Sequence, residues 1–172
     1  MASIQDNLRC LTQALDLLDQ LSDEDYAHPF PTPLGCAIGA QLRHIIDHYT
    51  CLLRGIRDGV VDYEDRPRDQ TIARSRAVAR QTLEAIMDEL RALPADRTHR
   101  PLSVQIATGA LADVHSGPAP SSLARELQFV LLHTVHHYAL IAVELRTRGL
   151  PCDPDLGVAP ATLAWRQQQA SA

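Results

Sequence analysis

The sequence lacks the features that mark membrane, secreted and nucleic-acid-binding proteins. It has no apolar run of about 18 residues, so we expect no membrane span. The opening residues, MASIQDNLRC, lack the charged start and apolar stretch of a secretory signal. The net charge is −5 and no long block of like charge occurs, whereas a general nucleic-acid binder needs a basic surface. We therefore expect a cytoplasmic protein with no nucleic-acid or membrane partner.

The cysteines also lack a metal-binding pattern. The four cysteines, Cys10, Cys36, Cys51 and Cys152, form no CxxC pair. A structural zinc site usually needs such pairs. In a reducing compartment, isolated cysteines most often act as small hydrophobic residues. We therefore expect buried or half-buried cysteines and no zinc knuckle.

What the sequence does contain is helical periodicity. The chain has 172 residues, 45% of them hydrophobic, which is enough for one domain with a core. Leucines and isoleucines recur at spacings of three and four, which is typical of one face of a helix. Gly59, Pro94 and Gly149 follow such stretches as stop signals. The pattern predicts helices at residues 3–21, 36–58, 70–93 and about 122–148.

Four helices of about 20 residues predict an all-α four-helix bundle. We expect residues 1–172 to form a single domain. Between the third and fourth helices, the segment LSVQIATGALADVHSG at 102–117 loses the helical period. Its short β-favouring runs on either side of a Thr-Gly predict a small hairpin. The tail after residue 152 is expected to be mostly loop, with one turn around Trp165.

Two clusters of histidines lie inside the predicted second and fourth helices. LRHIIDHY at 42–49 contains His44 and His48, and LLHTVHHYALI at 131–141 contains His133, His136 and His137. Residues four apart lie one helical turn apart, so His133 and His137 can point at one place, whereas His136 diverges from His137 by about 100°. Three imidazoles can bind a divalent ion such as zinc, nickel or ferrous iron and leave positions open for a substrate. Buried, hydrogen-bonded histidines are an equally good interpretation of spacing alone.

Several other residues have both a functional and an ordinary interpretation. Asp47 could orient a ligand imidazole or form a surface salt bridge. Glu126 and Glu144 lie about two turns from the nearest ligand, which favours surface or helix-end roles over catalysis. Arg66 or Arg68 could attract an anionic substrate or belong to a solvated loop. Small residues share the His44 face and could leave room for a neighbouring helix or a substrate: Ala37, Ala40, Cys51 and Gly55.

The fourth predicted helix is apolar on nearly every side. Its face opposite the histidines contains Leu131, Val135, Tyr138, Ala142 and Leu145. A second apolar face needs cover. The crossover segment or the C-terminal tail could supply it, and a homodimer is the alternative.

The segments IGAQLRHIIDHYTCLL and ELQFVLLHTVHHYALI resemble the DinB-like superfamily of metal-binding four-helix bundles. The resemblance implies an up-down-down-up bundle with a long crossover between the second and third helices. It also implies a divalent metal ion bound by His44, His133 and His137, with His48 as a competitor for the place of His44. His136 matches no ligand position.

The resemblance further implies a class of chemistry. Members of the superfamily include S-transferases and isomerases that use a low-molecular-weight thiol. We therefore expect a metal-dependent enzyme that uses such a thiol on a small-molecule substrate. The alternatives are a non-catalytic metal or small-molecule binding module, a metal-dependent hydrolase, and a helical interaction protein. The helical motif does not select the substrate, and it identifies no catalytic residue.

Overall fold

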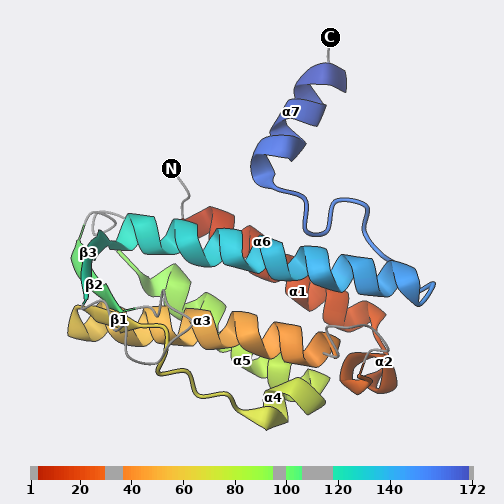
Figure 1. The fold of residues 1–172 in the computed structure, drawn as a ribbon, viewed down its shortest axis with the longest axis horizontal. Coiled ribbons are helices and arrows are strands. Elements are labelled where there is room, and N and C mark those ends of the chain that lie inside the picture. Colours follow the sequence, from red (N-terminus) through yellow and green to blue (C-terminus); the bar gives the residue numbers. More distant parts are fainter. Residues whose placement is uncertain (1–3, 30–36, 95–99, 106–117, 171–172) are drawn as a thin grey trace, which may run out of the picture.

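Four long helices form the body of the molecule, which is a computed structural model (Figure 1). The structure describes residues 4–29, 37–94, 100–105 and 118–170. In chain order the elements are α1 (Ile4–Gln20), α2 (Asp23–Ala27), α3 (Ile38–Asp58), β1 (Val60–Asp62), α4 (Gln70–Arg74), α5 (Arg76–Ala92), β2 (Pro101–Gln105), β3 (Ala119–Ser122), α6 (Leu123–Thr147) and α7 (Pro160–Ala170).

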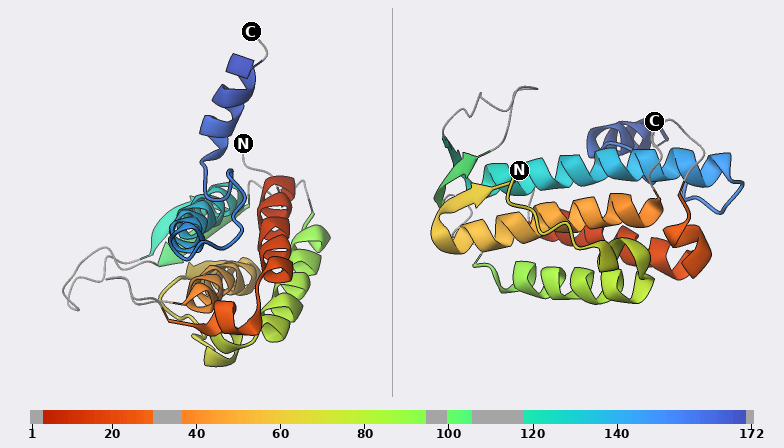
Figure 2. Two further views of the ribbon diagram at one scale, coloured as in Figure 1. Left: turned by 90° about the vertical axis from the view of Figure 1, so that its right-hand side faces the viewer. Right: turned by 60° about the horizontal axis from the view of Figure 1, so that its bottom comes forward.

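The long helices pack as a four-membered ring. Helix α3 packs against α5 and α6, and α1 packs against the same two helices. The end-on view in Figure 2 shows the four helices side by side. The segment after β1 returns along the bundle to α4, so α3 and α5 run in the same direction (Figure 1). A long connection between the second and third long helices was predicted, and the chain has one.

The core is apolar except where buried polar groups join helices. Tyr49 donates a hydrogen bond to Asn7 Oδ1 at 2.8 Å, and Asn7 donates to the Leu127 carbonyl at 3.2 Å. Tyr138 donates to the Cys10 carbonyl at 2.8 Å. A buried hydroxyl or amide needs such a partner, because water is not available to it. These bonds fix α1 against α3 and α6.

The helix boundaries agree with the prediction for three of the four helices. Helix α3 ends at Gly59, whose φ of 81° is a left-handed conformation that glycine adopts without strain. The third predicted helix, 70–93, is wrong as one element. Ser75 has an extended backbone, with φ −129° and ψ 113°, and its hydroxyl caps α5 by accepting from the Val78 N–H. Capping at Ser75 therefore divides the segment into α4 and α5.

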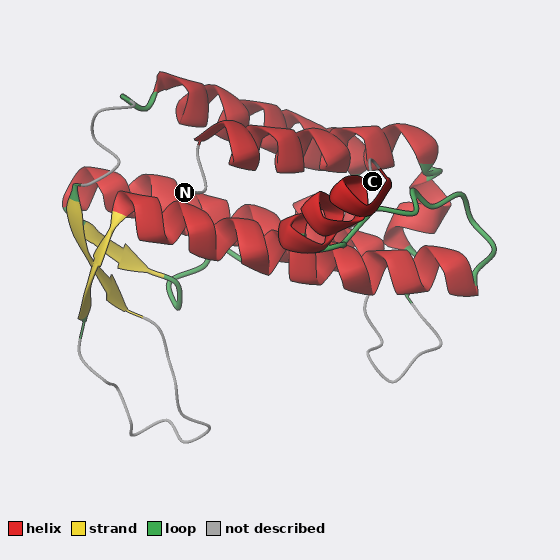
Figure 3. Cartoon of the chain, turned by 90° about the horizontal axis from the view of Figure 1, so that it is seen from above, coloured by secondary structure: helices red, strands yellow, loops and turns green. Residues whose placement is uncertain are grey.

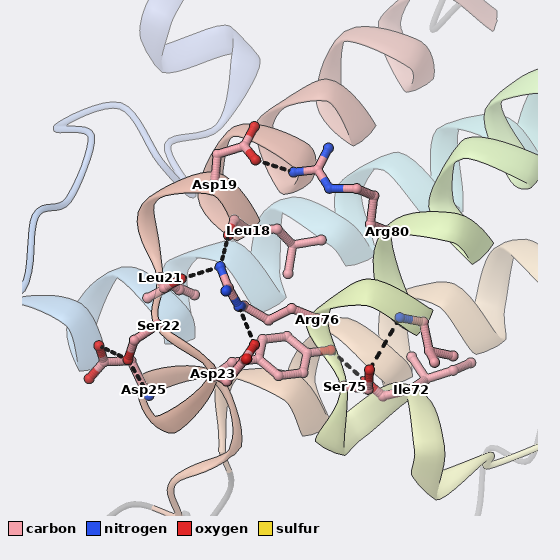
Figure 4. Close-up of polar contacts among 12 residues, drawn as sticks. Leu18, Asp19, Leu21, Ser22, Asp23, Asp25, Ile72, Ser75, Arg76 and Arg80 are labelled. Carbon is pink, nitrogen blue, oxygen red and sulfur yellow. Dashed lines mark hydrogen bonds and ion pairs between the residues drawn. The ribbon is translucent and has the colours of Figure 1, made fainter.

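A short helix, α2, was missed between α1 and α3. Its N-cap is Ser22, which accepts from the Asp25 N–H, so the serine three residues before an acidic residue was a usable signal. Arg76 at the start of α5 holds this junction, as Figure 4 shows. The Arg76 guanidinium donates to Asp23 at 2.6 Å, to the Leu18 carbonyl at 2.8 Å and to the Leu21 carbonyl.

The all-α prediction is only partly correct, because a three-stranded sheet lies at one end of the bundle (Figure 3). Strand β2 pairs in parallel with β1 and antiparallel with β3. Strand β2 lies where the first strand of the hairpin was predicted, whereas the Thr-Gly and the second predicted run lie outside the described residues. Its antiparallel partner β3 lies beyond the predicted segment and was not predicted. Strand β1 was not predicted, because three residues after a helix give no periodic signal.

The C-terminal tail differs from the prediction. Residues 160–170 form α7, which has no buried residue and projects from the bundle beside α6 (Figures 1 and 3). Before α7, Leu156 is buried, and Gly157 lies so close to the α6 backbone that a Cβ would be 2.2 Å from the Ala139 nitrogen. The tail and α1 together cover much of the second apolar face of α6. Leu132 and Val143 of that helix are exposed, and the homodimer stays a prediction.

No helix in the described part of the chain is long and apolar enough to cross a membrane. The cytoplasmic location stays a prediction.

Candidate metal centre

Helices α3 and α6 place four histidines against one another. Helix α3 supplies His44 and His48, and α6 supplies His133 and His137. Within each pair the residues are four apart and lie on one helix face. The two helices pack directly, so the two pairs meet across their interface. His48 and His137 are buried, and His44 and His133 are half-buried.

The imidazole rings are in mutual contact. The His44 ring centroid lies 4.5 Å from that of His48, 5.0 Å from His133 and 4.5 Å from His137. The His133 centroid lies 4.0 Å from His48 and 4.5 Å from His137. One ring nitrogen from each of His44, His48 and His133 lies within 4.8 Å of the others. Such a set can close around one ion with small side-chain movements.

Hydrogen bonds orient two of the imidazoles. His48 Nδ1 lies 2.9 Å from the His44 carbonyl, and His137 Nδ1 lies 2.6 Å from Gln41 Oε1. Both partners are acceptors, so each Nδ1 carries the proton in the neutral ring. The Nε2 atoms then carry lone pairs, and that of His137 lies 3.1 Å from His133 Nε2. Metal-binding histidines usually have this arrangement, with the remote N–H bound to a carbonyl or amide oxygen.

The cluster disfavours protonation. Burial, followed by the charges of neighbouring histidines, lowers the pKa of His44, His133 and His137 to about 3. Burial also lowers the pKa of His48. The positive charge of Arg66 contributes to the lowered pKa of His44, His48 and His133. At neutral pH the rings are therefore neutral, which is the form that binds a metal ion.

Aromatic and polar side chains from the crossover and from α6 border the cluster. The Tyr63 ring stacks on His48 with centroids 5.5 Å apart, and Phe129 stacks on His133 at 5.8 Å. The Tyr63 hydroxyl donates to Glu126 Oε2 at 2.9 Å. A hollow of about 390 Å³ opens next to His133, between Arg125, Gln128, Phe129 and Leu132. A small molecule could enter there and reach His133.

Comparison with known proteins agrees with this architecture. The sequence model of the DinB superfamily matches residues 8–141, which include all four histidines. The chain belongs to the DinB superfamily. Among solved structures, a DinB-like protein from Bacillus subtilis has a TM-score of 0.61 at 16% identity, covering 86% of this chain and 94% of that one. A DinB-like protein from Bacillus cereus has a TM-score of 0.56 at 19% identity, covering 84% and 89%. These two likenesses show the fold.

A curated relative is much longer. FK506-binding protein 5 of Rhizopus delemar is 30% identical over 110 residues, which are 64% of this chain and 28% of that protein. The DinB chain therefore spans under a third of this relative.

The DinB structure brings the predicted ligands His44, His133 and His137 together and adds His48 to them. His136 is exposed, and among the described residues its ring contacts that of His137 alone, with centroids 5.3 Å apart. The spacing argument separated His136 from the others correctly. It left His48 as a competitor of His44, whereas the structure places both rings in the same cluster.

The carboxylates differ from their expected surface roles. Glu126 is fully buried and accepts hydrogen bonds from Tyr63, Ser121 and Arg125, at 2.9, 2.5 and 3.0 Å. Glu144 is also buried, and burial raises its pKa to about 8. The helix-end alternative is correct, because Glu126 and Glu144 lie near the two ends of α6, but the surface alternative is wrong. The crossover, the sheet and the tail cover this helix, and a local pattern does not show them.

Asp47 is buried too, so it is not a surface salt bridge. It lies 3.6 Å from Arg43 and accepts from the Arg68 backbone N–H at 3.3 Å. Burial raises its pKa, against the effect of Arg43. Its described contacts hold the crossover on α3. Arg66 is half-buried with 20% of its side chain exposed, whereas Arg68 is exposed. The solvated-loop interpretation therefore fits Arg68 better than Arg66.

The small residues of α3 serve packing at two positions. A Cβ on Gly55 would lie 2.6 Å from the Val60 carbonyl oxygen, so this glycine lets β1 approach. The Cys51 thiol is 3.6 Å from the Asp65 carbonyl, and burial raises the pKa of the thiol to about 11. Neither residue leaves space for a substrate. Cys10 and Cys51 are buried and Cys152 is half-buried, as expected for small hydrophobic residues, while Cys36 lies outside the described residues.

Proposed function

We propose that this DinB-superfamily protein binds one divalent metal ion through His44, His133 and His137 and uses it with a low-molecular-weight thiol. The reaction would be S-transfer or thiol-assisted isomerisation of a small electrophile. The observation that carries the metal site is the convergence of neutral imidazoles from α3 and α6. We also infer the family's up-down-down-up helix order, with which the helix directions in Figure 1 are consistent.

The chain's own residues suit this role. Gln41 holds the proton on His137 Nδ1 and so presents Nε2. The Nδ1 bond to the backbone does the same for His48. A metal ion with neutral ligands keeps its positive charge, lowers the pKa of a bound thiol and stabilises the thiolate. The hollow beside His133 gives an electrophile access to the same place, and half-buried Arg66 favours an anionic substrate.

Metal analysis tests the site. Purified wild-type protein should carry up to one zinc, nickel or iron ion per chain. His133→Ala should lose it, because an open, three-ligand site depends strongly on each imidazole. His136→Ala is the matched control on the same helix, and it should retain the metal. Full occupancy in His133→Ala would contradict the assignment.

Turnover tests the chemistry. A chloro-nitroarene and a panel of small thiols should react in the presence of metal-loaded protein, and His137→Ala should be inactive. A p-nitrophenyl ester, run in parallel, detects the rival hydrolase, in which the metal activates water. If metal is bound but neither substrate is converted, the protein is a metal-binding module without catalysis.

The homodimer is a separate proposal. Exposed Leu132, Val143 and Trp165 are the apolar surface that a second copy could cover. Light scattering across micromolar concentrations should show twice the chain mass, and a monomeric mass throughout would contradict it.

A further inference from the structure

His48 is a fourth imidazole of the cluster, with no counterpart among the three ligands that the resemblance implies. Its side chain is only 4% exposed. Its ring centroid is 4.0 Å from His133, the shortest ring distance in the cluster, and 4.5 Å from His44. It also belongs to the set of three whose ligand nitrogens lie within 4.8 Å of one another. By position it is as good a ligand as the other three.

The hydrogen bonds of His48 leave one nitrogen unused. Its Nδ1 donates to the His44 carbonyl, so Nε2 has the lone pair. The nearby hydroxyl of Tyr63 donates to Glu126 instead, and the Tyr63 ring stacks on the imidazole at 23°, with centroids 5.5 Å apart. In the described part of the chain, Nε2 of His48 therefore has no hydrogen-bond donor. The Nε2 lone pair is therefore available to a metal ion beside those of the neighbouring imidazoles.

We propose that His48 is the fourth ligand of the resting centre and that the sulfur of a thiol takes its place. This inference rests on the proposed function. In the exchange, the bond from the metal to His48 Nε2 breaks and a bond to sulfur forms. The thiol proton is released to the buffer, so the sulfur binds as thiolate. His48 is suited to leave because the stacked Tyr63 ring and the hydrogen bond from His48 Nδ1 to the His44 carbonyl hold the free imidazole in place. The substrate class is thus a thiol that can displace an imidazole.

The best variant is His48→Asn. The Asn amide nitrogen can replace Nδ1 as the donor to the His44 carbonyl, whereas nothing replaces Nε2. His136→Asn makes the same change at the exposed histidine. Both variants and the wild type are loaded with cobalt(II), whose absorption reports ligand number and sulfur binding. The thiol probe is 2-mercaptoethanol.

Two results are expected. X-ray absorption should count four imidazoles in the wild type and in the control His136→Asn, but three in His48→Asn. The two affinities should then move in opposite directions. His48→Asn should bind cobalt at least about tenfold more weakly, because a ligand is lost, and 2-mercaptoethanol about tenfold more tightly, because no imidazole competes. A purely structural role for His48 would not strengthen thiol binding.

Other outcomes overturn the inference. Three imidazoles in the wild type would exclude a fourth imidazole ligand, and unchanged or weaker thiol binding in His48→Asn would exclude the exchange; both outcomes leave a three-histidine site intact. A wild-type protein that binds no metal would overturn both. If His48→Asn does not fold, the ligand count of the wild type decides, since four imidazoles require His48 and three contradict a four-imidazole resting centre.

Discussion

Two groups of polar side chains lie between helices, and they differ in how their charges and hydrogen bonds are matched. At the α1–α5 junction, Arg76 and Arg80 face Asp23, Asp19 and backbone carbonyls (Figure 4). At the α3–α6 interface, four imidazoles face one another. The arginines of the first group have carboxylate and carbonyl partners within the protein and need no ligand. In the second group, imidazoles contact one another and ring nitrogens with lone pairs point into the cluster. A bound cation would account for this arrangement.

The difference between the two groups predicts that a metal ion stabilises the protein through the histidine cluster and not through the arginine junction. At a free metal concentration about 1,000 times the dissociation constant, binding should stabilise the wild type by about 4 kcal/mol. A chelator should therefore lower the melting temperature of the wild type. In His133→Ala the chelator should have little effect. Equal chelator effects in both proteins would break the distinction between the two groups.

The arginine junction should affect stability and leave the metal site alone. Arg76→Ala removes the donor to the Leu18 and Leu21 carbonyls and the partner of Asp23. Unfolding in urea should show a loss of about 2–3 kcal/mol. Arg91→Ala, which removes an exposed ion pair with Asp88, should cost less than about 1 kcal/mol. Metal content should be unchanged in both variants, and a loss of metal in Arg76→Ala would contradict the separation.

Glu144 should make stability depend on pH. Its folded-state pKa is raised from 4.5 to about 8, chiefly by burial. Between these values the folded protein binds more protons than the unfolded chain, so stability falls as pH rises through this window. Glu144→Gln should remove this contribution and be about 2 kcal/mol more stable relative to wild type at pH 8.5 than at pH 5.5. Urea unfolding at the two values measures it. Exposed Glu84→Gln is the control, and an equal change there would refute the assignment.

Arg66 should distinguish anionic from neutral ligands of the histidine cluster. Replacing half-buried Arg66 with Gln should weaken mercaptoacetate binding to the metal-loaded protein about tenfold relative to 2-mercaptoethanol, which corresponds to about 1.4 kcal/mol. Arg68→Gln removes the same charge from an exposed position of the same loop and should change the ratio less than about twofold. Equal effects of both variants would mean that only net charge matters.

Much of the fold could be predicted because it depends on periodicity along the chain. The apolar stripes of α1, α3 and α6 and the stop at Gly59 are local signals. Sequence reasoning missed the break at Ser75, strand β1 and helix α7. Ser75 is one polar residue in an otherwise helical pattern, and β1 has too few residues to show alternation. Helix α7 buries no residue, so it lacks the apolar face on which the prediction depended.

For the site, the sequence by itself determined which side chains share a helix face. The four-residue spacing of His44 and His48, and of His133 and His137, follows from the geometry of one helix. Only the tertiary structure decided that these faces meet, that His48 joins the cluster and that Glu126 and Glu144 are buried. The reason is physical: periodicity fixes directions around a single axis, whereas distances and burial depend on the packing of segments far apart in the chain.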